Sequence, residues 1–193
     1  MPVAVFGFDW DLTLFPVSTD DDTPASDVLE SKLGEIELSV HDFNAYVSEL
    51  KTYLTEMTNM CAKKGWYFFI VTRNSEANVR YLLKEVVHVN DSRFVVIAEP
   101  SRAHNKAELA RIHLGPVSIH GAVMVLVDDS EKELKNAAAQ VCAWNEAGYG
   151  VTLHNICVAK PCRGALYKGS TYGLMNQSDV CAQINALIKQ YGV

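Results

Sequence analysis

The stretch VAVFGFDWDLTLF, residues 3–15, places two carboxylates, Asp9 and Asp11, directly after a short apolar run. A run of this length is typical of a strand that is covered on both faces, as strands are in parallel sheets. Burying one carboxylate is unfavourable, and a second one beside it adds repulsion. The stretch therefore predicts a buried strand followed by two acids whose charge is compensated, and a bound cation is the first candidate for that compensation.

Apolar runs of the same kind recur along the chain and alternate with helical patterns. Strands are expected at residues 66–71, 94–98 and 123–127 and within 148–156. Helices are expected at residues 41–63, about 76–87, about 103–113, 131–140 and about 178–190. Such alternation predicts βαβ units. The expected fold class is α/β: a Rossmann-like, doubly wound, mostly parallel sheet of about five strands, with helices on both faces and a minimal cap.

The length of 193 residues suits one domain with a full core. We expect a single domain over residues 1–193. A short flap or loop insertion is expected at about residues 16–40, because its first part, PVSTDDDTPAS, is polar and rich in turn-forming residues. A C-terminal extension is expected at about residues 157–193.

Composition and charge exclude several classes of protein. The net charge of −6 disfavours nonspecific binding to nucleic acid or to anionic membranes. No stretch reaches the roughly 20 apolar residues that a membrane span needs, and the N-terminal residues do not read as a signal peptide. Five cysteines without tight spacing are typical of reduced thiols. We therefore expect a cytoplasmic protein with no membrane contact and no preference for nucleic acid; the oligomeric state stays open.

Polar residues follow the predicted strands at the points where these strands end. The C-terminal ends of parallel strands lie at one edge of the sheet, and ligands bind at that edge. Each residue has a simpler explanation when it is taken alone, as a helix cap, a turn residue or a surface charge. Their order and spacing instead predict one joint site, built from Asp9, Asp11, Thr72, Lys106, Asp128 and Asp129.

With these residues in place, the sequence resembles the haloacid dehalogenase-like superfamily of phosphatases and phosphotransferases. FDWDLTLF (residues 8–15) is similar to the first motif of that superfamily, DxDxT, and FIVTRN (69–74) is similar to the second. Lys106 in HNKAEL fits the third motif, and VLVDDS (125–130) fits the fourth. The resemblance covers about residues 3–155. Its nearest likeness is to the magnesium-dependent phosphatase family, small enzymes with little cap, in which Tyr is more usual at the position of Leu12.

The resemblance implies a Mg²⁺-dependent phosphomonoester hydrolase that works through an aspartyl-phosphate. Asp9 would be the nucleophile. Asp11 would protonate the leaving oxygen and then act as general base on water. Thr72 and Lys106 would bind the phosphoryl oxygens. Arg73, which directly follows Thr72, is a further candidate for contact with the substrate phosphate.

The same resemblance implies the ligands of the metal. Asp9, the backbone carbonyl of Asp11, and Asp128 or Asp129 would hold Mg²⁺, which prefers hard oxygen ligands. The metal would also shield the anionic nucleophile from the charge of the phosphate. The chain does not decide between Asp128 and Asp129 as the direct ligand.

The short segment between Asp11 and the second strand predicts an open site with room for a bulky substrate, such as a phosphoprotein that carries phosphotyrosine or phosphoserine. Three alternatives stay open. The protein could be a phosphotransferase or phosphomutase, a nucleic-acid-end phosphatase, or a non-catalytic binding protein that keeps the fold. The natural substrate and the role of residues 157–193 are not readable from the sequence.

Overall fold

The structure is a computed structural model, and it describes residues 3–19, 23–35, 38–115, 119–158 and 173–192. Five strands form a fully parallel sheet in the order β3-β2-β1-β4-β5. Their bounds are Ala4–Phe8 (β1), Tyr67–Thr72 (β2), Val95–Ala98 (β3), Val123–Asp128 (β4) and Thr152–Cys157 (β5). β2 and β3 lie on one side of β1, and the chain then crosses to the other side of β1, where β4 and β5 lie. The predicted doubly wound α/β fold is thereby confirmed.

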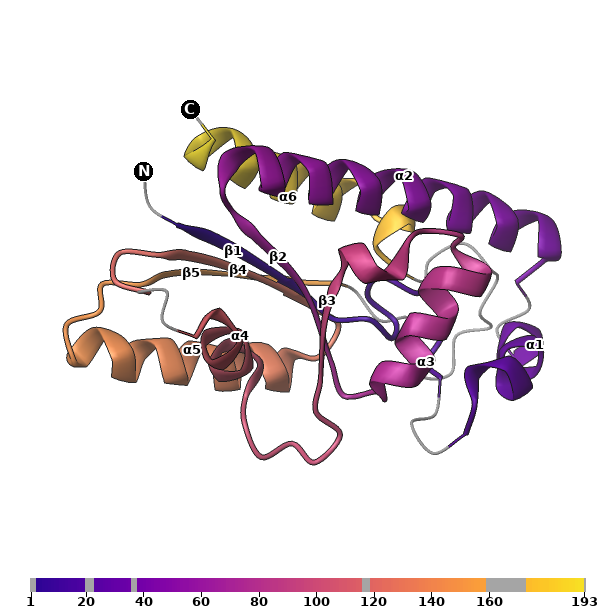
Figure 1. Ribbon diagram of the computed structural model, residues 1–193, viewed down its shortest axis with the longest axis horizontal. Coiled ribbons are helices and arrows are strands. Elements are labelled where there is room, and N and C mark those ends of the chain that lie inside the picture. Colours follow the sequence, from indigo (N-terminus) through magenta and orange to yellow (C-terminus); the bar gives the residue numbers. More distant parts are fainter. Residues whose placement is uncertain (1–2, 20–22, 36–37, 116–118, 159–172, 193) are drawn as a thin grey trace.

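Helices cover both faces of this sheet (Figure 1). One face carries α2, α6, and α3 with the π-helical turn that continues it. The other face carries α4 and α5. The bounds are Ala25–Glu35 (α1), Val40–Lys64 (α2), Glu76–Tyr81 (α3), Lys106–Leu114 (α4), Glu131–Glu146 (α5) and Ser178–Tyr191 (α6). The π-helical turn is Leu82–Val86, and short 3-10 turns occupy Asp91–Arg93 and Leu174–Asn176.

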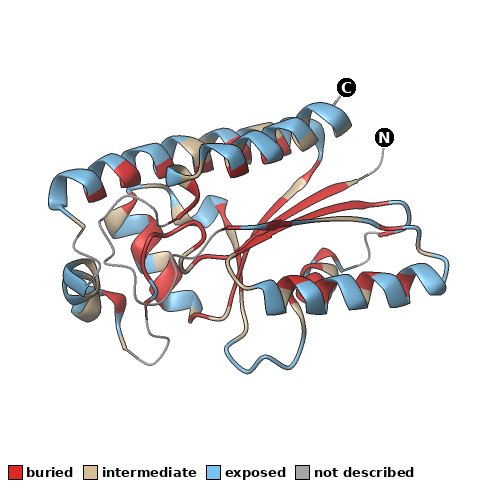
Figure 2. Ribbon diagram, turned by 180° about the vertical axis from the view of Figure 1, so that it is seen from behind, coloured by how far each residue is buried: buried red, intermediate tan, exposed pale blue. Residues whose placement is uncertain are grey.

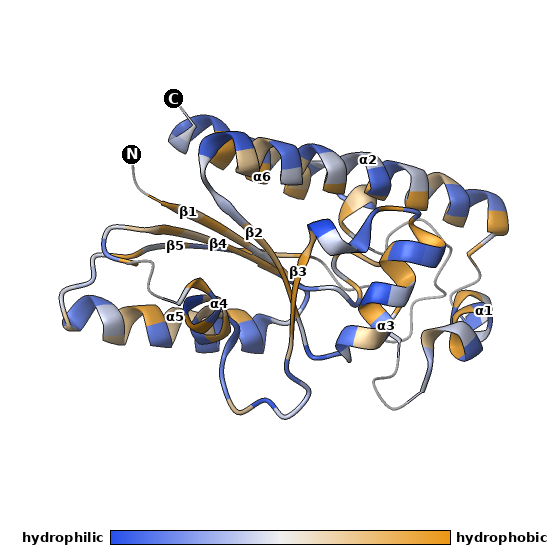
Figure 3. Cartoon of the chain, in the orientation of Figure 1, coloured by the Kyte–Doolittle hydropathy of each residue, from blue (hydrophilic) through white to orange (hydrophobic). Residues whose placement is uncertain are grey.

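The side chains of β1 divide between the two layers of the core. All five residues of the strand are buried. Phe6 and Phe8 pack toward α2 and α6, whereas Val5 packs toward α4 and α5, as expected when successive side chains point to opposite faces. Figure 2 shows the central strands buried along their length, and Figure 3 shows that they are hydrophobic while the helices alternate in character. The polar residues after β1 therefore start from a rigid, fully covered strand.

Local sequence signals set the helix ends that border the site. Ser39 caps α2 by accepting a hydrogen bond from the backbone N–H of Asp42, at 3.1 Å. The helix ends at Gly65, whose φ of +66° suits glycine. Ser75 caps α3 in the same way, with the N–H of Asn78 at 3.2 Å. The cap at Ser75 begins α3 only three residues after the end of β2.

The segment between β1 and α2 contains a helix that the sequence analysis did not expect. Residues 16–40 were expected to be a flap or loop, yet residues 25–35 form the helix α1 beside α3 (Figure 1). Ala25, Leu29 and Leu33 recur at helical spacing and turn toward the core, a pattern that the preceding polar run obscured. Asn78 fixes the start of the helix, because its side-chain oxygen accepts from the N–H of Ala25 at 3.0 Å.

The C-terminal residues complete the core rather than merely following it. Val180 and Ile184 of α6 are buried in the same cluster as the apolar side of α2. The helix expected at about 178–190 is confirmed as α6. Most of the remaining extension, residues 159–172, lies outside the described residues. No helix of the described chain is long and apolar enough to cross a membrane.

Candidate functional site

The polar strand ends meet where the strand order changes direction, between β1 and β4. Phe8 pairs with Val127 in the sheet, and the N–H of Asp9 donates to the carbonyl of Val127 at 2.9 Å. Asp128 ends β4 and therefore lies beside Asp9, although the two are far apart in the sequence. A cavity of about 650 Å³ opens at this edge, and Asp9, Asp11, Lys106, Asp128 and Asp129 all line it.

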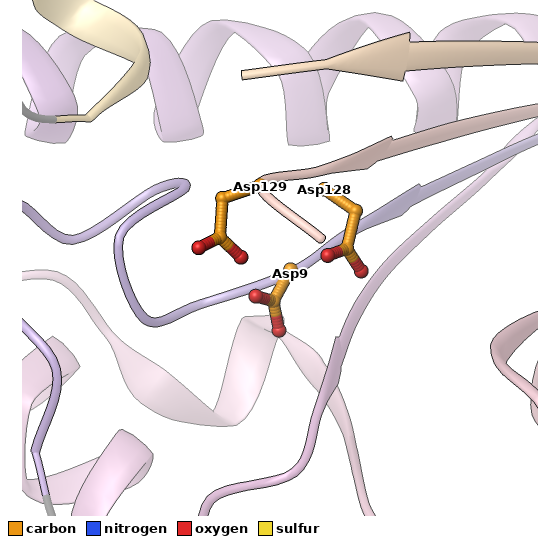
Figure 4. Close-up of side chains that lie close together, drawn as sticks. All are labelled: Asp9, Asp128 and Asp129. Atoms are coloured by element: carbon orange, nitrogen blue, oxygen red, sulfur yellow. The ribbon is translucent and has the colours of Figure 1, made fainter. Parts of the chain in front are cut away.

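Three carboxylates form a group that could hold a metal ion. Asp9, Asp128 and Asp129 each offer one oxygen, and these oxygens all lie within 4.8 Å of one another. Figure 4 shows the three side chains gathered at the ends of β1 and β4. Asp9 and Asp128 are buried, and Asp129 is partly so. A set of hard oxygen ligands at this spacing suits Mg²⁺ or a similar divalent cation.

Lys106 lies between two of these acids. Its Nζ is 2.6 Å from Asp9 Oδ1 and 2.6 Å from Asp128 Oδ2. Asn105 caps α4 and so fixes the helix start on which Lys106 stands, as its side chain accepts from the N–H of Glu108. The ammonium thus compensates part of the charge of Asp9 and Asp128.

Burial sets the proton affinities of this cluster. Burial raises the pKa of Asp9, and the neighbouring Lys106 acts against that rise. Burial raises the pKa of Asp128 to about 6, again against the effect of Lys106. Burial alone would lower the pKa of Lys106, but the two carboxylates outweigh it and raise that pKa. Lys106 thus keeps its positive charge, but this one charge does not balance the negative charges of Asp9, Asp128 and Asp129.

The carboxylate of Asp11 points to different partners. It accepts hydrogen bonds from the backbone N–H of Thr19 at 2.7 Å and from Asn74 Nδ2 at 3.0 Å. It therefore does not belong to the group of three carboxylates. Burial raises the pKa of Asp11 to about 6, against the hydrogen bond from Thr19. A carboxyl group with such a pKa can both give and take a proton near neutral pH.

Thr19 and Asn74 were missed by the sequence reasoning. Thr19 lies in the segment that was expected to be a loop, and Asn74 comes two residues after Thr72. Asn74 Nδ2 also donates to the carbonyl of Thr19 at 3.0 Å, so the two residues that bind the carboxylate of Asp11 also bind each other. An amide two residues after the end of β2 was the available signal for Asn74.

The loop after β1 is held in a strained shape. Leu12 has a φ of +59°, a region that residues other than glycine seldom adopt. Thr13 fixes the loop on two sides. Its Oγ1 accepts from the N–H of Asp129 at 3.0 Å, and its carbonyl accepts from the N–H of Leu174 at 2.7 Å. The threonine of the DxDxT pattern thus joins the ends of β1 and β4 to the C-terminal segment.

Thr72 and Arg73 are placed differently from the other predicted residues. Thr72 is fully buried at the end of β2, and its hydroxyl accepts from the N–H of Asn74 at 3.0 Å. The hydroxyl keeps its proton for donation, but Thr72 is not among the described residues that line the cavity.

Arg73 lines the cavity, yet its N–H groups donate to other residues of the chain. It forms ion pairs with Glu99 and with Glu133, both at 2.9 Å. It also donates to the carbonyls of Glu99 at 3.2 Å and His104 at 2.8 Å, and its Nε donates to Glu133 at 3.3 Å. These bonds use all five donors of the guanidinium. In this arrangement Arg73 fastens the segment after β3 to α5 and has no N–H left for a substrate phosphate.

Comparison of the chain with family models, with curated proteins and with solved structures finds no match in any of the three. The chemistry of the site is therefore read from its geometry. A buried carboxylate beside a lysine, two further carboxylates within metal-binding distance, and a separately seated carboxyl group share one open cavity. Such a set can bind a divalent cation, present an anionic nucleophile and transfer a proton.

Proposed function

We propose that this chain is a Mg²⁺-dependent phosphomonoester hydrolase of the haloacid dehalogenase-like superfamily, acting through an aspartyl-phosphate on Asp9. The observation that carries the proposal is the meeting of Asp9, Asp128 and Asp129 within 4.8 Å, with Lys106 against two of them. The resemblance of the four sequence motifs supports the same reaction. The acids lie at the switch point of the sheet, where ligands bind in folds of this type.

The charge of the group supports a divalent cation. Three carboxylates face one ammonium, so the ionised group keeps two negative charges, and burial already raises the pKa of Asp9 and Asp128. Asp9, Asp128 and Asp129 would hold the cation through carboxylate oxygens. When bound, Mg²⁺ would neutralise charge on the phosphoryl group and on its anionic nucleophile.

The proposed chemistry divides between two carboxyl groups. A carboxylate oxygen of Asp9 attacks phosphorus, the bond to the leaving oxygen breaks, and Asp11 gives its proton to that oxygen. Asp11 then takes a proton from water as the water oxygen attacks phosphorus and releases Asp9. The pKa of about 6 for Asp11 suits both transfers. Two N–H groups of Lys106 point to Asp9 and Asp128, which leaves one for a phosphoryl oxygen.

The proposed substrate is bulky, because little covers the site. The insertion between β1 and α2 adds one short helix, α1, as a minimal cap, and the cavity is open to solvent along its rim. A phosphoprotein carrying phosphotyrosine or phosphoserine is the substrate class that this proposal favours. The same residues would serve a phosphotransferase or phosphomutase, and these reactions differ in the group that accepts the phosphoryl from Asp9.

The proposal is tested by hydrolysis of p-nitrophenyl phosphate at neutral pH, with Mg²⁺ or with EDTA. We expect the wild type to need Mg²⁺, and Asp9→Asn to lose activity by about a thousandfold or more, since the nucleophile is gone. Asp179→Asn, which removes an exposed acid from α6, should stay active. Wild-type activity in EDTA, or an active Asp9→Asn variant, would contradict the proposal. Phosphoryl transfer to added alcohols would show the transferase instead.

A further inference from the structure

A second hollow adjoins the cavity of the candidate site. It has a volume of about 510 Å³ and lies between residues 102–105 and the outer side of α5. The two hollows share Arg73, Arg102 and Glu133 as lining residues. The rest of its lining is mostly polar and includes His104, Asn105, Lys132, Asn136 and Gln140. A substrate held at Asp9 therefore has a polar path past Arg102 along the protein surface.

The cations that line the site cavity differ in how they are paired. Lys106 contacts Asp9 and Asp128, Arg73 contacts two glutamates, and Lys32 lies 3.3 Å from Glu35. Arg102 is exposed, and no carboxylate of the described chain lies within ion-pair distance of its guanidinium. Among the described residues that line the cavity, Arg102 is thus the cation without an ion pair, and its electrostatic interaction with Glu133 acts over a longer distance.

The backbone around Arg102 is held in place. Arg102 has a φ of +57°, which is unfavourable for a residue with a side chain. The neighbouring residues are fastened, because the N–H of His104 donates to Glu99 at 3.1 Å and Arg73 binds the carbonyl of His104. Strain that the surroundings enforce is typical of functional positions. The arginine is therefore presented at the junction of the two hollows by a constrained turn.

Resting on the proposed function, we propose that Arg102 binds a second anionic group of the substrate, either a carboxylate or a second phosphate. The preferred substrates are then phosphomonoesters that carry another negative charge beyond the phosphate to be cleaved. Five acids line the same cavity, and its other three cations, Lys32, Arg73 and Lys106, are each paired with a carboxylate, so Arg102 is the favourable position for that charge. A guanidinium also matches the planar or tetrahedral oxygens of such groups with paired N–H donors.

The test compares matched esters in matched variants. The value of kcat/KM is measured with Mg²⁺ for 4-carboxyphenyl phosphate and for its neutral counterpart, 4-carbamoylphenyl phosphate. The ratio is kcat/KM for the carboxyl ester divided by kcat/KM for the carbamoyl ester. We expect it to be about tenfold lower in Arg102→Gln than in wild type, and to lie between these two values in Arg102→Lys. Arg93→Gln, which removes an arginine bonded to Asn59 before β3, should keep the wild-type ratio. Because each ratio is taken within one protein, a loss of folded enzyme cancels. A third ester, 1,4-phenylene bisphosphate, shows whether phosphate is preferred to carboxylate.

The outcomes separate this inference from the proposed function. If Arg102→Gln has the same ratio as wild type, because kcat/KM falls equally for both esters or not at all, the role of Arg102 is overturned while the proposed hydrolase activity stands. If wild type hydrolyses none of the esters, the proposed function fails, and binding decides the inference. Calorimetry would then compare 4-carboxybenzylphosphonate with 4-carbamoylbenzylphosphonate. A preference for the carboxylate that Arg102→Gln removes supports the second anion site, and equal affinities overturn it.

Discussion

Replacing Lys106 by methionine should destabilise the protein through charge rather than through packing. The ammonium lies 2.6 Å from both Asp9 and Asp128, and the three side chains are 6%, 10% and 2% exposed. Methionine keeps most of the apolar stem, so the main loss is the compensating charge. Removing one partner of a buried ion pair lowers the free energy of unfolding by about 3–5 kcal/mol. We expect a loss of that size at pH 8 in EDTA, measured by urea unfolding.

The loss should depend on pH in a direction that the site dictates. The pKa of Asp128 is already raised from 3.8 to about 6, and removing Lys106 removes an interaction that lowers it. A carboxyl group with a raised folded-state pKa favours the folded state below its unfolded pKa, and that contribution disappears as pH rises through the folded pKa. The variant should therefore differ most from wild type at pH 8 and least near pH 5.

Two controls isolate the effect of charge. Lys135→Met removes a lysine whose side chain is 77% exposed and pairs with Glu131, and it should change stability by no more than about 0.5 kcal/mol. Adding Asp128→Asn to Lys106→Met should recover part of the loss, because one uncompensated carboxylate is gone. The reasoning would be refuted if Lys106→Met lost as much at pH 5 as at pH 8, or no more than Lys135→Met.

Two further changes test the metal group and the contact between the C-terminal segment and α2. Mg²⁺ at ten times its dissociation constant should raise the free energy of unfolding by about 1.4 kcal/mol. Asp129→Asn, which removes one of the three clustered carboxylates, should lose most of that gain in urea titrations; an equal gain would argue against the group as the metal site. Gly173→Ala should lower stability by about 1–3 kcal/mol, because its φ is +78° and the new Cβ would lie 2.0 Å from the hydroxyl of Tyr46. Gly150→Ala is the matched control, with a φ of +63° and nothing within 4 Å, and thermal unfolding should separate the two; equal losses would show that backbone strain alone matters.

The sheet could be predicted because burial and apolar sequence coincide in its central strands. Every residue of β1 and β4 is buried, and in both strands the apolar run of the sequence ends directly before an aspartate. The edge strand β5 is mostly exposed or half-buried, so its sequence located it only within residues 148–156, and it spans Thr152–Cys157. Parallel pairing then brings Asp9 to Asp128 by topology alone, without knowledge of any side-chain contact.

The rest of the site depends on contacts that no short pattern contains. Asp11 is seated by Thr19 and Asn74, which are 55 positions apart, and their meeting requires the placement of α1 and α3. Arg73 was expected to face substrate from its position after β2. Its actual partners, Glu99 and Glu133, come from two other segments, and only the packed structure shows that they take up its donors.

The C-terminal segment supports the loop that carries Asp11, although it follows the last strand. The N–H of Leu174 donates to the carbonyl of Thr13, and the hydroxyl of Thr13 accepts from the N–H of Asp129. Tyr46 of α2 donates to the carbonyl of Leu14 at 2.7 Å, and the lack of a side chain at Gly173 leaves room for its ring. A loop with a strained residue keeps its shape only when its surroundings determine it. The segment after residue 172 therefore helps to hold the proposed nucleophile loop against the metal-binding group, a role that its sequence, lacking charged or nucleophilic residues at 173–176, does not reveal.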